Sequence, residues 1–152
     1  MTTPSRLLLL DTNVVIFLSR GGAIGQAIDA RFQLRARAER PLLSVVTLGE
    51  ALAFARFRNW GEPRIETLRG LLREFVVVDI TRRAVLERYA EIDSFLKQQG
   101  RAIGNNDAWI AACASAADAT LLTTDRDFDP LHGTYLDRVW IDPQNPGEDP
   151  TA

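Results

Sequence analysis

The chain has 152 residues, of which 46% are hydrophobic and 25% charged, and its formal net charge is −2. These values are typical of an ordinary globular protein of one domain. The longest apolar stretches are too short to cross a membrane, and the net charge argues against tight, non-specific binding to nucleic acid.

The cysteine content limits both the location and the metal chemistry of the chain. Cys113 is the only cysteine, so no internal disulfide can form, and we expect a cytoplasmic protein. Cys113 and His132 cannot build a Cys/His metal site by themselves, so oxygen atoms must hold any metal. Asp11 interrupts the leucine run 7–10, which therefore does not match the core of a signal peptide.

Short apolar runs alternate with helical patterns along the chain. In the first half, the spacing and the glycine and proline breaks predict strand 6–10, helix 12–19, helix 23–40, strand 42–46, helix 47–59 and helix 64–73. In the second half, they predict strand 75–80, a helix from Thr81 to Gly100, helix 105–117, strand 120–123 and strand 139–141.

This alternation predicts an α/β fold, with a central, mostly parallel sheet of about five strands and helices on both faces. The leucine run is then a central strand, because strands buried on both faces are continuously apolar. We expect one domain over residues 1–141. Residues 142–152 are rich in Pro, Gly and acid, which predicts a peripheral tail.

Four acidic residues lie where this fold would gather them. Asp11 follows the first strand, Glu50 lies one turn into the helix after the second, and Asp125 follows the fourth. Asp107 lies in the first turn of the alanine-rich helix. Because ligand sites of parallel sheets lie beyond the carboxyl ends of the strands, we expect these carboxylates to converge if the strands are neighbours.

Each acid also has a purely structural interpretation. Asp11 is a favoured N-cap, and Thr47 with Glu50 fits a capping box. The helix dipole favours Asp107, and an Asx-turn favours Asp125. These interpretations stay open for single residues, but capping does not explain why the connections aim their acids at one edge of the sheet.

Converging carboxylates repel each other unless a cation neutralises them. An all-oxygen cluster suits Mg²⁺ or Mn²⁺, which lower the pKa of a bound water and stabilise charge on phosphate oxygens. Asp127 is a further candidate ligand, and its alternative is an exposed acid in a turn. Side chains suited to bond a carboxylate or a phosphate, or to cap the helix that carries Asp107, are Thr12, Asn13, Thr123, Thr124, Asn105 and Asn106.

Four stretches of the chain, in this order, resemble the PIN-domain family of small metal-dependent ribonucleases. They are LLLLDTNVVIF, SVVTLGEAL, GNNDAWIAACA and LLTTDRDF. The resemblance implies that Asp11, Glu50, Asp107 and Asp125 surround Mg²⁺ or Mn²⁺, with Asp127 as an open alternative to Asp125. It also implies polar support from Thr12, Asn13, Thr47, Asn105 and Thr124.

The size of the chain is similar to that of VapC toxins of bacterial toxin–antitoxin pairs. This likeness implies endonucleolytic cleavage of RNA of the tRNA or rRNA class, a homodimer, and a cognate antitoxin protein as partner. The alternatives are a PIN nuclease that processes RNA without being a toxin, and a module that binds RNA or protein without cutting it.

Two other enzyme classes place acids at strand ends and fit less well. Haloacid-dehalogenase phosphatases need a second acid where this chain has Asn13, and receiver domains need a lysine at a late strand end, whereas Lys97 lies in a predicted helix. The arginines at 31, 35, 37 and 40 are interpreted as the solvated side of one helix, or as contacts to RNA phosphates or an acidic partner.

Overall fold

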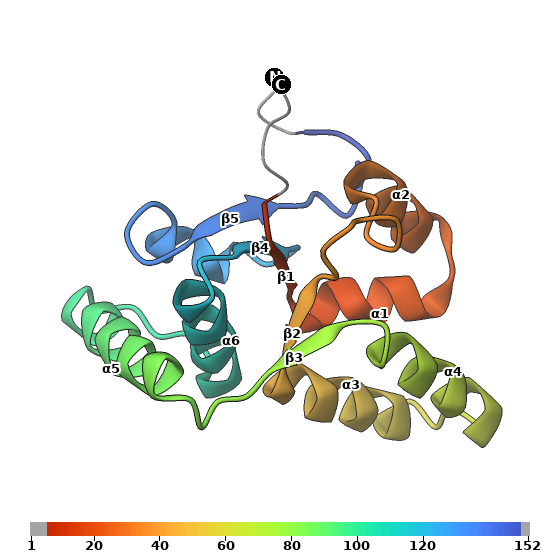
Figure 1. The fold of residues 1–152 in the computed structure, drawn as a ribbon, viewed down its shortest axis with the longest axis horizontal. Helices are drawn as coiled ribbons and strands as arrows, with labels where there is room; N and C mark the ends of the chain where they lie inside the picture. Colours follow the sequence, from red (N-terminus) through yellow and green to blue (C-terminus); the bar gives the residue numbers. More distant parts are fainter. Residues whose placement is uncertain (1–5, 150–152) are drawn as a thin grey trace.

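The leucine run forms the middle strand of a five-stranded parallel sheet, β1 (Leu8–Leu10). The computed structural model describes residues 6–149, and within them the strand order is β3-β2-β1-β4-β5, with each neighbouring pair parallel (Figure 1). The other strands are β2 (Leu42–Ser44), β3 (Val76–Val78), β4 (Thr120–Thr123) and β5 (Asp137–Trp140). The predicted fold class is confirmed.

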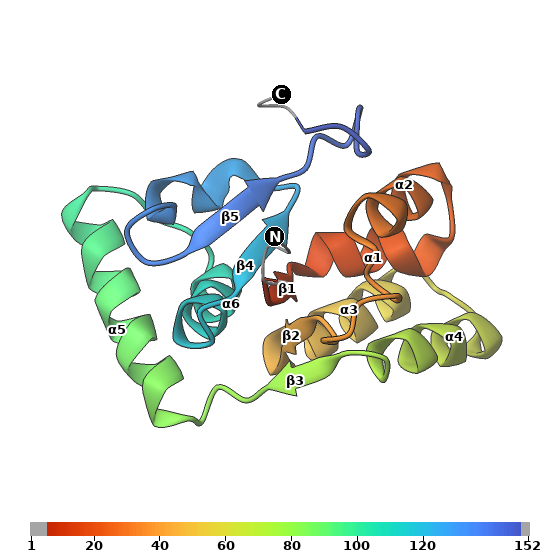
Figure 2. The same cartoon turned by 45° about the horizontal axis from the view of Figure 1, so that its top comes forward.

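Helices cover both faces of the sheet (Figures 1 and 2). On one face lie α1 (Thr12–Arg20), α2 (Ala23–Phe32), α3 (Val45–Phe57) and α4 (Glu62–Leu72). On the other lie α5 (Arg83–Gln98), α6 (Asn105–Ala116) and the short 3-10 helix η1 (Arg126–Leu131). A hydrophobic core lies on each face of the sheet, and successive residues of β1 point into opposite cores. Leu8 and Leu10 pack with the first group of helices, and Leu9 packs with the second.

The predicted helix over 23–40 is wrong in its second half. Helix α2 ends at Phe32, because Gln33 adopts a left-handed conformation with φ 51°. The chain then turns, and Leu34, which is 2% exposed, enters the core beside α1 and α4. Burial of Leu34 outweighs the helix propensity of the alanines and arginines that follow it.

The predicted strand over 42–46 is also too long. The Ser44 hydroxyl accepts a hydrogen bond from the backbone N–H of Val46 at 3.2 Å, so Ser44 caps α3 and the helix begins at Val45. Capping therefore outweighs the strand preference of the two valines. The other predicted elements occur with their ends shifted by at most two residues.

The C-terminal segment lies beside α2. The Arg31 guanidinium donates hydrogen bonds to the backbone carbonyls of Pro146 and Glu148, at 3.4 and 2.8 Å. The domain boundary at Ile141 stays a prediction, and residues 150–152 of the predicted tail lie outside the described residues. Among residues 6–149, no helix combines the length and the apolar character that a membrane span requires.

The topology brings three acid-bearing connections together. Strands β2, β1 and β4 are adjacent, and the chain leaves their carboxyl ends through Glu50, Asp11 and Asp125. The connections from β1 run to one side of the sheet and those from β4 to the other, which is the arrangement that opens a crevice for ligands. The expected convergence of the strand-end acids follows from this order.

Candidate metal centre

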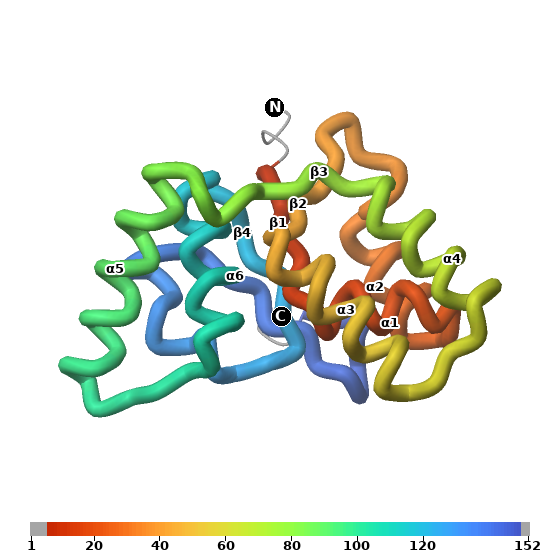
Figure 3. The backbone as a smooth tube through the Cα atoms, turned by 90° about the horizontal axis from the view of Figure 1, so that it is seen from below, coloured from red at the N-terminus to blue at the C-terminus, as the bar shows by residue number. Residues whose placement is uncertain are grey.

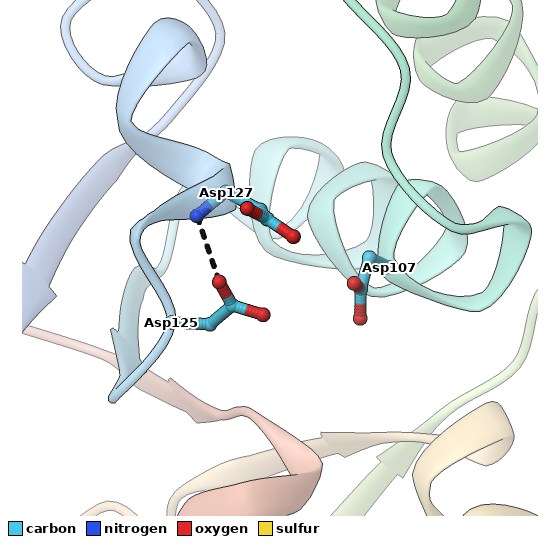
Figure 4. A group of neighbouring side chains, drawn as sticks. All are labelled: Asp107, Asp125 and Asp127. Atoms are coloured by element: carbon cyan, nitrogen blue, oxygen red, sulfur yellow. Dashed lines mark hydrogen bonds between the residues drawn. The ribbon is translucent and has the colours of Figure 1, made fainter.

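Three aspartates face one another at the carboxyl edge of the sheet. Each of Asp107, Asp125 and Asp127 offers a carboxylate oxygen that lies within 4.8 Å of the other two (Figure 4). Asp107 comes from the first turn of α6, Asp125 is the N-cap of η1, and Asp127 lies in the first turn of η1. The residue left open in the sequence, Asp127, therefore belongs to the cluster.

The turn after β4 has the geometry predicted for Asp125. The Asp125 Oδ1 atom accepts a hydrogen bond from the backbone N–H of Asp127 at 2.8 Å and so caps η1 (Figure 4). This Asx-turn confirms the structural interpretation of Asp125 and also aims both side chains toward Asp107. Capping and convergence are therefore compatible at this position.

Asp11 lies at the buried floor of the site, with only 3% of its surface exposed. Its backbone N–H continues the sheet by donating to the carbonyl of Leu122 at 2.9 Å. One carboxylate oxygen accepts from the backbone N–H of Thr12 and the other from the Thr123 hydroxyl, each at 2.8 Å. Asp11 thus caps α1, as its structural interpretation predicts, and both of its oxygens are held in place.

Glu50 does not form the predicted capping box, because the N-cap of α3 is Ser44, three residues before Thr47. Its Oε1 atom accepts a hydrogen bond from the Thr12 hydroxyl at 2.7 Å, and its Oε2 atom accepts one from the Asn106 side-chain amide at 3.1 Å. The buried Thr47 hydroxyl lies 3.0 Å from that of Thr12. Since Thr12 gives its single proton to Glu50, Thr47 is the donor to Thr12.

The acids act on each other electrostatically. Burial, with repulsion from Asp11, Asp125, Glu50 and Asp127, raises the pKa of Asp107 to about 7. Burial also raises the pKa of Asp11 to about 6, although the hydrogen bonds from Thr123 and Thr12 oppose the rise. Both values lie above the ordinary aspartate pKa of about 3.9. All five carboxylates therefore belong to one electrostatic unit.

The other polar residues predicted for the site separate into two groups. Thr12 and Thr47 contact Glu50 directly or through one another, as described above. Asn13 and Asn105 are exposed, and their side chains make no hydrogen bond with any other described residue. Thr124 accepts a hydrogen bond from the indole N–H of Trp140 through its backbone carbonyl at 3.0 Å, and not through its side chain.

The contact between Asn106 and Glu50 was missed in the sequence. We expected Asn105 and Asn106 to cap α6, but the N-cap is Gly104, with no side-chain hydrogen bond. Asn106 donates instead to Glu50, 56 residues away. No local pattern signals such a contact, because it depends on how α3 and α6 meet at the edge of the sheet.

The donor set fits a divalent cation. Among the described residues, no arginine, lysine or histidine forms an ion pair with any of the five acids, which are Asp11, Glu50, Asp107, Asp125 and Asp127. Three carboxylates within a few ångströms of each other, without a protein cation, match the oxygen ligands that Mg²⁺ and Mn²⁺ prefer. The charge balance of the site calls for a cation from outside the chain.

Comparison with known proteins agrees with the fold. The sequence model of the PIN domain matches residues 8–132. Ribonuclease VapC1 of Haemophilus influenzae strain R2866 is 33% identical over 115 residues, which cover 76% of this chain and 84% of that protein. Ribonuclease VapC1 of strain KW20/Rd is 32% identical over the same shares of the two chains.

Solved structures give the same result. A chain of the VapBC-1 complex from nontypeable H. influenzae superposes with a TM-score of 0.73 and 28% identity, over 87% of this chain and 96% of that one. A chain of DNA-bound VapBC from Salmonella typhimurium superposes with a TM-score of 0.74 and 23% identity, over 88% and 96%. The match over residues 8–132 and the identity with the VapC1 ribonucleases show that this chain belongs to the PIN domain family.

Proposed function

We propose that this protein is an endoribonuclease that depends on Mg²⁺ or Mn²⁺, and that it is the toxin of a VapBC-type toxin–antitoxin pair. The observation that carries the proposal is the meeting of Asp107, Asp125 and Asp127 beside Asp11 and Glu50, with no protein cation among the described residues to balance them. The VapC1 relatives, which are named as ribonucleases, support RNA as the substrate.

The residues of the cluster would divide the work by position. Asp107, Asp125 and Asp127 would hold the cation, since their oxygens already lie within reach of one centre. The predicted roles of Asp11 and Glu50 as ligands stay proposals, and each of these side chains has both oxygens engaged by hydrogen bonds. When bound, the cation supplies a water of lowered pKa and stabilises negative charge on the phosphate oxygens.

The chain's own groups would set the geometry of hydrolysis. Hydrogen bonds from Thr12 and Thr123 fix the Asp11 carboxylate at the buried bottom of the site, so it keeps its position relative to the other acids. Thr12 and Asn106 hold Glu50 at the rim, where a phosphodiester would enter. A water molecule would lose a proton as its oxygen forms a bond to phosphorus, and the bond from phosphorus to one ribose oxygen would break as that oxygen takes up a proton. Such fixed donors and charges act without reorganisation during the reaction.

The partners follow from the same proposal. The VapBC complexes among the similar structures support a cognate antitoxin protein as the inhibitor. We further propose a homodimer, RNA of the tRNA or rRNA class as the substrate, and action in the cytoplasm, where such RNA is found. The alternative is a PIN nuclease that processes RNA and is not a toxin. An antitoxin gene next to the gene of this protein would decide against that alternative.

Cleavage of total cellular RNA tests the proposed activity. The protein is incubated with Mg²⁺ or Mn²⁺, with EDTA in a parallel sample, and the Asp11→Asn variant is compared after its fold has been verified by circular dichroism. Discrete fragments that require both the metal and Asp11 are expected. Intact RNA with the folded, metal-loaded protein would favour the non-cutting binding module, and cleavage in EDTA would overturn the metal assignment.

A further inference from the structure

A second charged site lies at the opposite end of the sheet. It is a pocket of about 340 Å³, lined by Leu34, Arg35, Arg37, Ala38, Arg40, Arg73, Glu74 and Phe75, and is called the arginine pocket below. The lining residues come from the segments that lead from α2 into β2 and from α4 into β3 (Figure 3). The arginine pocket therefore lies at the amino ends of the strands. The acidic cluster, which consists of Asp11, Glu50, Asp107, Asp125 and Asp127, lies at their carboxyl ends.

The way in which α2 ends creates this pocket. On a continuous helix over 23–40, the arginines would point in several directions around its axis. Because the chain turns after Phe32, Arg35, Arg37 and Arg40 instead line one concavity, together with Arg73 from the end of α4. The interpretation of Arg35, Arg37 and Arg40 as part of the solvated side of one helix is therefore wrong, because α2 ends before them.

The positive charge of the arginine pocket is largely unbalanced. Its lining holds four arginines and one acid, Glu74, in a chain whose net charge is −2. Glu74 lies 3.7 Å from Arg35, and both partners are about half exposed, so the pair is weak. Arg40 and Arg73 form neither an ion pair nor a side-chain hydrogen bond with any described residue.

Arg37 is held in place by the backbone. Its guanidinium donates hydrogen bonds to the carbonyls of Phe32 and Arg6, at 3.2 and 2.7 Å. These two carbonyls fix the position of the Arg37 guanidinium at the pocket. Arg40 and Arg73, which have no partner among the described residues, lie beside it, and together they form a surface suited to an anion with several oxygens.

The lining favours phosphates over an acidic protein. The anchors of protein interfaces, most often Trp, Tyr and Arg, lie in well-packed pockets whose surroundings exclude water. Here the large apolar residues, Leu34 and Phe75, are 2% and 6% exposed and face the core, so only Ala38 offers exposed apolar surface. Guanidinium groups bind phosphate oxygens in a bidentate manner and need no such anchor.

We propose that the arginine pocket binds backbone phosphates of the RNA substrate at a distance from the acidic cluster. This inference rests on the proposed function. The two sites are separated by at least the length of the strands, roughly 10 Å for three residues, so one phosphate group cannot contact both. The substrate class is then RNA that extends from one end of the sheet to the other, such as a folded RNA, and the arginine pocket anchors it.

Binding of a labelled tRNA at several salt concentrations tests the inference. Fluorescence anisotropy is measured in EDTA, so that no cleavage occurs, for the wild type, the R40Q/R73Q variant and the control R83Q/R88Q. The control removes the same two charges from the exposed side of α5. We expect R40Q/R73Q to bind about tenfold more weakly and the slope of log K against log salt to fall by about 1.8, at about 0.9 for each lost phosphate contact. The control should behave as the wild type.

An unchanged affinity and salt slope for R40Q/R73Q would overturn the inference. The inference would also be overturned if R40Q/R73Q lost binding to the antitoxin while its binding to RNA stayed intact. Cleavage of the same tRNA, measured in parallel with Mn²⁺, separates this result from the proposed function. If all variants cut with the same KM, the arginine pocket fails and the nuclease stands. If the wild type binds tRNA through Arg40 and Arg73 but cuts no RNA, the nuclease fails and the phosphate site stands.

Discussion

Thr123 holds the floor of the acidic cluster from a fully buried position. Its hydroxyl donates to Asp11 at 2.8 Å and accepts from the backbone N–H of Asp125 at 2.9 Å. It therefore links two acids that follow neighbouring strands. The hydrogen bond also lowers the pKa of Asp11 against the larger effect of burial, so it favours the charged carboxylate.

Replacing Thr123 by valine should destabilise the protein by about 1–3 kcal/mol, because a buried carboxylate loses a donor and a buried N–H loses its acceptor. The loss should be greater at pH 8, where Asp11 is ionised, than at pH 5. Urea unfolding of the metal-free protein at both pH values measures it. Equal losses at the two pH values would show that the hydrogen bond does not act on the ionised form of Asp11.

Thr120 provides the matched control on the same strand. Its hydroxyl is buried and has no hydrogen-bond partner among the described residues. Thr120→Val should therefore be neutral or stabilising in the same urea experiment, since it removes a polar group that is buried without a partner. If Thr120→Val were as costly as Thr123→Val, the shape of the side chain and not its hydrogen bonds would explain both results.

Much of the site could be predicted from single residues, because strand ends are easy to locate. Asp11 and Asp125 follow apolar strands, so their meeting required only that β1 and β4 be neighbours. The environment of Glu50 could not be predicted in this way. Its nearest sequence signal, Thr47, suggested a cap, whereas the true cap at Ser44 frees Glu50 to meet Asn106 from α6.

At the scale of elements, close contact between α1 and α2 depends on Gly25. A Cβ atom at this position would clash with the carbonyl oxygen of Phe17 and lie 3.1 Å from the Cα of Leu18. The obstacle is backbone, which cannot rotate away as a side chain can. The glycine thus lets α2 approach the helix that begins directly after Asp11.

Gly25→Ala should destabilise the protein by about 1–3 kcal/mol, because α1 and α2 must move apart. Gly70→Ala is its control: Gly70 lies inside α4, and a Cβ there would meet nothing within 4 Å. This control should stabilise the protein by about 0.5–1 kcal/mol through helix propensity. Urea denaturation compares the two variants, and a neutral Gly25→Ala would contradict the close packing of the helices.

The elements themselves were more predictable than their ends. Strands and helices with an unbroken apolar pattern, such as β4 and α6, occur almost as expected from the sequence. The segment after Phe32 was not predictable from local patterns, because its alanines and arginines are good helix formers. Its path is set by Leu34 reaching the core, and that path also forms the arginine pocket.

At the scale of the molecule, charge is separated between the two ends of the sheet. The acidic cluster lies at the carboxyl ends of the strands and the arginine pocket at their amino ends. RNA approaching the protein would be repelled by the bare cluster and attracted by the pocket. A divalent cation removes the repulsion, so the metal and the arginines would serve the same substrate from opposite ends.

The stability of the metal-free protein should fall between pH 5 and pH 8. The folded-state pKa values of Asp107, about 7, and Asp11, about 6, lie above the unfolded value, so folding takes up protons in this range. The stabilising effect is complete below about pH 4 and is lost as the pH rises through these values. One such group changes the free energy of unfolding by at most roughly 1.4 kcal/mol per pH unit.

Mn²⁺ should reverse this trend, because it binds the deprotonated acids and competes with protons. Urea unfolding at pH 5 and pH 8, in EDTA and in Mn²⁺, gives the four values needed. Stabilisation by Mn²⁺ is expected to be greater at pH 8. An equal effect of Mn²⁺ at both pH values would argue against binding at Asp107 and Asp11.

The most direct test of the acidic cluster is the rate of cleavage of a defined RNA by the Asp107→Asn variant, relative to the wild type, in Mn²⁺. Asp118→Asn removes the same charge from an exposed residue, two positions past the C-terminal end of α6, and is the control. Asp107→Asn should cut at least roughly a hundredfold more slowly, and Asp118→Asn at the wild-type rate. Cleavage by Asp107→Asn at the wild-type rate would contradict a nuclease centre built on this cluster.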